Sequence, residues 1–121
     1  MTAEKALSRP QRVKVGYIPF EVEYLDDEQW RKRGLEEGDG GNLFGYKGSI
    51  LVRTFDELHE NNVREVLLHE VLHACAYISG LSVEGEYHRL DDVEETFVAR
   101  ISPVLLDVLR SNPSLLKYLV G

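Results

Sequence analysis

Two histidines stand four residues apart in the segment HEVLH at positions 69–73. On a helix this spacing puts both imidazoles on one face with their rings directed the same way. Two imidazoles held like this supply half of a tetrahedral zinc site. Glu70 directly follows His69, so its carboxylate lies beside such a metal and can take a proton from metal-bound water. The segment therefore predicts Zn²⁺ as a cofactor and hydrolysis as the chemistry.

A chance match is the alternative interpretation, because short patterns recur and a helical histidine can be an ordinary polar group. The flanking residues favour the metal, since they are too apolar for a solvated helix face: Leu67, Leu68, Val71, Leu72 and Ala74. Burying two histidines and a glutamate among them is costly unless something pairs with them.

The predicted site needs a third protein ligand. The pattern with a glycine and a third histidine shortly downstream is excluded, because Ala76 and Ser79 occupy those positions. The other common solution is a glutamate on a second helix about twenty residues later. Glu94 lies 21 positions after His73 and meets this expectation.

The helical wheel separates Glu94 from its neighbour Glu95. Successive helical residues turn by about 100°, so Glu94 shares its direction with the apolar residues Val98 and Ile101, whereas Glu95 lies on the flank. Glu95 also stands three residues after Asp92, which is capping-box spacing. We therefore predict Glu94 as the third ligand and keep Glu95 as the alternative.

Further candidates lie near this motif. Tyr87 and His88 fall in the connection between the two helices, and either could overhang the metal and stabilise an oxyanion, as could Tyr77. We include Tyr87 among the candidate catalytic residues. The alternatives are that Tyr77 packs in the core, that Tyr87 and His88 are solvated, that His88 is the third ligand, or that Glu94 only caps its helix with Asp91.

Helical periodicity predicts the elements that carry these residues. One helix is expected from about residue 62 to 79 with Gly80 as its stop, and another from about 92 to 110, where Pro103 should kink or divide it. A short helix at 114–120 closes the chain.

The first half of the chain predicts strands. Apolar residues alternate with polar or small ones over 13–24, and two further strands at 43–46 and 49–53 flank a Lys47-Gly48 hairpin turn. Residues 26–32, which begin with three acidic residues, should form a capped short helix with Trp30 on its inner side. The glycine-rich segment 34–42 is predicted to be a loop.

Composition restricts the partners. The 121 residues form one domain, with 1–12 as a flexible tail and 13–121 as the folded unit. A net charge of −7 disfavours nucleic acid. The single cysteine, Cys75, permits no intrachain disulfide, and no apolar stretch matches a signal peptide or membrane span. These features predict a soluble, cytoplasmic protein without a membrane partner. They leave the oligomeric state undetermined.

The chain resembles the gluzincin branch of zincin metallopeptidases, and it looks most like the small single-domain versions of phage and bacterial genomes. The resemblance covers roughly residues 50–113 and depends on the HEVLH element, with the stretch 94–98 as weaker support. It implies His69, His73 and Glu94 as zinc ligands and Glu70 as the general base. In a phage-encoded protein the location would be the host cytoplasm.

The resemblance also implies a geometry and one departure. The strand Ser49–Arg53 would edge the cleft and pair with an extended substrate. Larger members carry an asparagine or aspartate four residues after the ligand glutamate to orient a zinc-bound histidine, and this chain has Val98 there.

We therefore expect an α+β, zincin-like domain in which a small antiparallel sheet packs on the active-site helix and a second, glutamate-bearing helix. The expected activity is zinc-dependent hydrolysis of a peptide or protein substrate. The cleft should be open on one side unless the loop at 34–42 acts as a lid. The rival hypotheses are a zinc-stabilised binding module with little turnover and a hydrolase that acts on a non-peptide bond.

Overall fold

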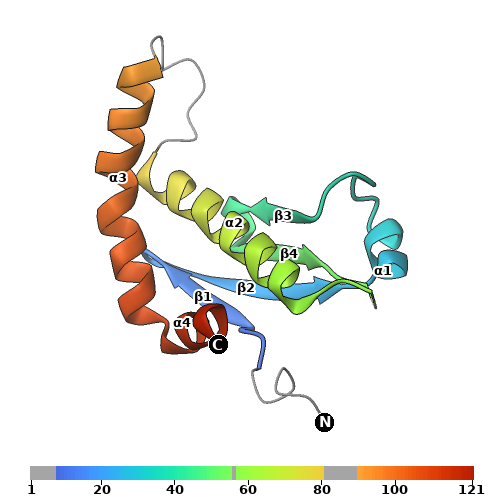
Figure 1. The fold of residues 1–121 in the computed structure, drawn as a ribbon. Coiled ribbons are helices and arrows are strands. Elements are labelled where there is room, and N and C mark those ends of the chain that lie inside the picture. Colours follow the sequence, from blue (N-terminus) through green and yellow to red (C-terminus); the bar gives the residue numbers. More distant parts are fainter. Residues whose placement is uncertain (1–7, 56, 81–89) are drawn as a thin grey trace.

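The computed structural model describes the backbone of residues 8–55, 57–80 and 90–121, and the side chains in these ranges except at 90–96, 98 and 99. Within them the fold is α+β, as predicted, with helices packed on a four-stranded sheet (Figure 1).

The sheet is mixed, which corrects the prediction of an antiparallel sheet. Its strands are β1 (Arg12–Val15), β2 (Ile18–Leu25), β3 (Gly41–Phe44) and β4 (Ser49–Arg53), in the order β1-β2-β4-β3. The neighbours β1 and β2 pair antiparallel, as do β3 and β4, whereas β2 and β4 are parallel. The reason is the long connection after β2, which places β3 at the far edge of the sheet. The next strand, β4, then lies between β2 and β3 and runs in the same direction as β2.

This order also corrects the strand expected to border a substrate. The prediction assigned that role to Ser49–Arg53, but β4 pairs on one side with β2 and on the other with β3. Its backbone groups are therefore already used inside the sheet. The strand at the sheet edge beside β4 is β3, and it pairs with no second strand in the described part of the chain.

The helices match the predicted elements closely. They are α1 (Asp27–Lys32), α2 (Glu60–Ser79), α3 (Leu90–Ser111) and α4 (Pro113–Val120). Asp26 and Gln29 form a capping box at the start of α1, and Trp30 is fully buried, as predicted. Gly80 ends α2 with a left-handed backbone conformation (φ 81°), which glycine adopts without steric cost.

Two details of α3 differ from expectation. Pro103 lies inside the helix without dividing it into two elements. Asp92 is already helical, two residues after Leu90. An N-cap residue stands just outside the first turn, so the predicted capping box of Asp92 with Glu95 is wrong. The capping role of Glu95, which was one reason to prefer Glu94 as the third ligand, therefore also fails.

One face of the sheet is covered by α2, with α3 and α4 beside it near β1 (Figure 1). Between these layers lies the main apolar core. Its buried members come from the sheet and all three helices: Val13, Val15, Phe20, Val22, Ile50, Val52, Val63, Leu67, Val71, Ala74, Cys75, Ile101, Val108, Leu115 and Tyr118. A smaller cluster of Leu25, Trp30 and Leu51 packs separately. Cys75 is buried as predicted, and burial raises the pKa of its thiol to about 11.

None of the helices in the described ranges is both long and apolar enough for a bilayer crossing. The cytoplasmic location stays a prediction.

The first turn of α2 is tied to both ends of the described chain. Arg9 donates two hydrogen bonds, of 2.9 and 2.8 Å, to the carboxylate of Glu60. The Tyr118 hydroxyl of α4 donates to the same carboxylate. Arg64 donates to the Tyr118 carbonyl oxygen at 2.8 Å and stacks on its ring. Within the segment predicted as a flexible tail, Arg9 therefore contacts the folded unit and β1 begins at Arg12.

Removing the Glu60 charge should destabilise the domain at neutral pH. The Arg9 guanidinium is the main cause that lowers the pKa of Glu60, from an ordinary value of 4.5 to about 2. The charged form therefore stabilises the fold above about pH 4.5, and this contribution is lost as the pH falls toward 2. We expect Glu60→Gln to cost about 1–2 kcal/mol at pH 7, since the ion pair is only partly buried.

Urea unfolding at several pH values checks this prediction. The difference between wild type and Glu60→Gln should shrink as the pH falls below about 4.5 and become small near pH 2, where about half of the Glu60 carboxylates in the folded protein are protonated. The matched control is Glu57→Gln at an exposed position just before α2. A difference that stays constant between pH 7 and pH 2 would contradict the assigned ion pair.

Candidate metal centre

The position of each residue along α2 determines which way it faces. His59 caps the helix, because its Nδ1 accepts a hydrogen bond from the Asn61 amide at 3.0 Å. Glu70 lies seven residues after the buried Val63, so it falls on the core-facing side of the helix and is itself buried. His69 and His73 lie beside that side and are exposed, which corrects the expectation that both histidines are buried together with the glutamate. The helix therefore presents two accessible imidazoles next to one inward carboxylate.

The two imidazoles converge. Their Nε2 atoms lie 3.1 Å apart, their ring centroids are 4.7 Å apart, and their planes meet at 75°. A tetrahedral zinc with Zn–N bonds of about 2.0–2.1 Å would hold two ligand nitrogens about 3.3 Å apart. The observed separation fits this requirement without a change of helix geometry, so the donor pair suits the predicted ion.

The electrostatics of His73 also suit a metal ligand. Burial is the larger cause that lowers the pKa of this side chain, and the nearby His69 adds to it. A lower pKa keeps the imidazole neutral at pH 7, which leaves a lone pair on Nε2 for coordination.

Glu70 is a buried carboxylate, with 6% of its surface exposed. In the part of the chain that the structure describes, no hydrogen bond or ion pair reaches this carboxylate. Burial is the largest cause that raises its pKa; the neighbouring His69 acts in the opposite direction, and the charge of Asp39 raises it further. Among the described residues this buried acid thus has no hydrogen-bond partner, which is costly for the stability of the fold.

The edge strand β3 lies unusually close to α2 at Glu70 and Tyr77. A Cβ atom added at Gly41 would lie 2.8 Å from Glu70 Oε2 and 3.0 Å from Val66 Cγ1. A Cβ atom at Gly45, just after β3, would lie 2.8 Å from three ring atoms of Tyr77. Both positions therefore require glycine for the strand to approach the helix. This approach covers Glu70 and leaves the histidines open.

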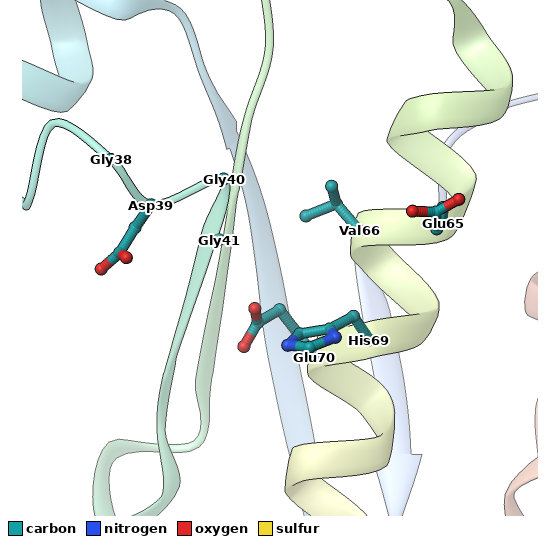
Figure 2. A pocket seen from close by; sticks show the side chains of 8 residues that line it. All are labelled: Gly38, Asp39, Gly40, Gly41, Glu65, Val66, His69 and Glu70. Atoms are coloured by element: carbon teal, nitrogen blue, oxygen red, sulfur yellow. The ribbon is translucent and has the colours of Figure 1, made fainter.

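A groove runs between α2 and the β3 side of the sheet. It contains two adjoining hollows of about 290 and 410 Å³, and both are lined by Asp39, Gly41, His69 and Glu70. Figure 2 shows the Glu70 side chain directed from α2 toward β3, with His69 beside it and the segment Gly38–Gly41 opposite. The candidate metal donors and the carboxylate thus share one open groove.

The glycine-rich loop forms a fixed wall of this groove. Arg53 donates a side-chain hydrogen bond of 2.6 Å to the Glu37 carbonyl, and its amide donates to the Gly40 carbonyl at 2.8 Å. The Trp30 indole donates to the Glu36 carbonyl at 2.8 Å. These contacts hold the backbone on both sides of Asp39, which keeps this carboxylate at the groove.

The predicted site residues are only partly described. His69, Glu70 and His73 come together as predicted, and Tyr77 lies on the groove rather than in the core. Glu94 lies in α3 by its backbone, seven residues before the buried Ile101. The side chains of Glu94 and Glu95 lie outside the described residues, as do Tyr87 and His88 altogether. Among the side chains that are described, no cluster of three metal donors exists.

Sequence reasoning missed Asp39, Gly41 and Gly45. The segment at 34–42 is predicted to be a loop, although its last two residues belong to β3. A glycine inside or next to a strand often marks a close approach of another segment, and the pair Gly41 and Gly45 carries that signal. The helix that approaches could not be identified from it.

Comparison of the chain with protein-family models, with curated proteins and with solved structures found no match.

Because of the close contact at Gly41, we predict that alanine at position 41 destabilises the domain, whereas alanine at the neighbouring position 40 does not. Gly41→Ala should destabilise the domain by about 1–3 kcal/mol, because the new methyl group overlaps Glu70 and Val66. Gly40→Ala is the matched control, since its Cβ would meet only Val66 Cγ2 at an ordinary 3.6 Å. It should be neutral or slightly stabilising.

Urea unfolding of a double-mutant cycle measures the contact itself. In a Glu70→Ala background the cost of Gly41→Ala should fall, because part of the overlap is gone. Equal costs in both backgrounds would show that β3 does not rest on Glu70.

Proposed function

We propose that this chain is a zinc-dependent hydrolase of peptide bonds with a zincin-like fold. The observation that carries the proposal is the convergence of two imidazole nitrogens, 3.1 Å apart, beside a buried carboxylate without a hydrogen-bond partner in the described residues. Metal donors and a carboxylate of this kind are the parts that metal-assisted hydrolysis needs.

His69 and His73 would hold the ion through Nε2, and we propose Glu94 as the third protein ligand. When bound, zinc supplies a Lewis acid that polarises a carbonyl and lowers the pKa of water to about 7. An open groove supports this assignment, because a catalytic site must leave one position for the substrate.

Glu70 would act as the proton carrier. Its carboxylate takes a proton from the attacking water and delivers it to the nitrogen of the leaving amine. Burial raises the pKa of Glu70, which strengthens its carboxylate as a base. A structural metal site has no need of such a group.

The substrate would lie along β3. This strand has an edge with no partner strand in the described part of the chain, and it borders the hollow that His69, Glu70 and His73 line. An extended peptide can pair with such an edge through its main chain. This pairing would hold a peptide carbonyl near the histidines and favours a peptide over a compact small molecule as substrate.

Zinc content tests the ligand assignment. Elemental analysis of purified protein should find about one zinc per chain, lost in His73→Ala, because a site of this type needs its full ligand set. Glu94→Ala should also lose zinc, whereas Glu95→Ala should keep it. A folded wild type that binds no added zinc would contradict the proposal, and loss in Glu95→Ala alone would reassign the third ligand.

Peptide cleavage tests the role of Glu70. Glu70→Gln should retain zinc but reduce cleavage of a proteome-derived peptide library by about 10²-fold or more, the usual contribution of a general base. The matched control is Glu65→Gln, an exposed glutamate on the same helix that also borders the groove. If wild type and Glu70→Gln behave alike, the protein is better explained as a zinc-stabilised binding module.

A further inference from the structure

A third hollow adjoins the groove beyond His73. It encloses about 530 Å³ and is lined by aromatic, apolar and glycine residues together with one lysine: Tyr17, Ile18, Pro19, Gly45, Tyr46, Lys47, Gly48 and Tyr77. We call it the tyrosine hollow. Three of the six tyrosines of the chain meet there.

Two turns of the sheet build its walls against the last turn of α2. A Cβ atom at Gly16, between β1 and β2, would lie 2.9 Å from Ile78 Cγ2, and one at Gly45 would lie 2.8 Å from the Tyr77 ring. Each turn therefore touches the helix through a glycine. The residue that follows each glycine is a tyrosine, Tyr17 or Tyr46, so both rings stand on the rim of the hollow.

These rings are not part of the core. Tyr17 is 82% exposed, Tyr46 is 78% exposed and Tyr77 is 40% exposed. Large aromatic side chains gathered at an exposed concave surface are typical of ligand and protein interaction sites.

The tyrosine hollow is continuous with the candidate metal centre. Gly45 and Tyr77 line it, and they also line the hollow that contains His69, Glu70 and His73. Tyr77 stands four residues after His73 on α2, which corresponds to about 6 Å along the helix axis. An extended peptide advances about 6.6 Å in two residues, and residues two apart face the same side.

The charge around the hollow restricts its ligand. The ammonium of Lys47 lies 5.8 Å from the centre of the Tyr46 ring and 5.2 Å from that of Phe44. A second cation there would be repelled. At the other end of the groove the charged residues are acidic, including Asp39 and Glu65. The tyrosine hollow therefore suits an uncharged apolar side chain better than lysine or arginine.

We propose that the tyrosine hollow is a specificity subsite that binds an aromatic or large aliphatic side chain of the substrate, two residues from the cleaved bond. The inference rests on the proposed peptidase function for the position of the cleaved bond. The binding of an apolar side chain by the hollow can be measured without cleavage.

The first test is a cleavage profile of the zinc-loaded protein on a peptide library that varies one position at a time. Wild type should prefer phenylalanine, tyrosine or leucine over alanine by about tenfold or more at one position, two residues from the cleaved bond, since an apolar side chain in a pocket contributes at this level. The double variant Tyr17→Ser, Tyr46→Ser should reduce this ratio to near one. Val120→Ser, at an exposed position on α4, should keep it. An unchanged ratio in the double variant would overturn the proposal.

The second test uses binding alone. N-acetyl-phenylalanine amide, added to the full-length wild-type protein, should shift the NMR signals of Tyr17, Tyr46, Lys47 and Tyr77, and N-acetyl-alanine amide should not. Shifts elsewhere, or none, would overturn the assignment of the hollow. If the hollow binds the phenylalanine probe but the protein cleaves no peptide, the hollow stands as an apolar binding site and the proposed function fails.

Discussion

The close approach of β3 to α2 is the contact on which the candidate site depends. Gly41 allows the strand to rest on Glu70, and Gly45 allows the following turn to rest on Tyr77. The same approach covers the carboxylate and leaves the two histidines facing the groove. A Cβ atom at either glycine would lie within 3 Å of side-chain atoms of Glu70 or Tyr77, so these side chains would have to shift. Gly41 and Gly45 thus allow β3 and the turn after it to lie close to α2 along the groove.

The site combines a local and a non-local part. The histidine pair requires only a turn of helix, since its members stand four residues apart. The environment of Glu70 requires the sheet, because it is made by β3 and by the loop that Arg53 and Trp30 hold. The geometry of the two histidines therefore depends on the helix, whereas the environment of the Glu70 carboxylate depends also on contacts with the sheet and the loop. A substitution in the loop can therefore change the pKa of Glu70 without changing the positions of His69 and His73.

Prediction from the sequence succeeded for elements with strong hydrophobic periodicity and failed for the pairing of the strands. The bounds of α2, the buried Trp30 and the left-handed Gly80 followed from local patterns. Alternation along a strand identifies its buried face but not its neighbours, so it could not predict the parallel pairing of β2 and β4. The edge position of Ser49–Arg53 was implied by the resemblance to zincins, and the strand order contradicts it. The histidine pair was predictable from spacing alone. The tyrosine hollow was not, because two turns and one helix end, distant in sequence, form it.

The free edge of β3 has a consequence for the behaviour of the protein in concentrated solution. Exposed strand edges are templates for aggregation, and natural proteins commonly keep them short. β3 has four residues, and two of them, Gly41 and Asn42, have low β propensity. The 3-10 helix η2 (Gly45–Lys47) ends it directly. Such an edge offers few ladder bonds to another copy of the chain, which limits its tendency to seed a fibril.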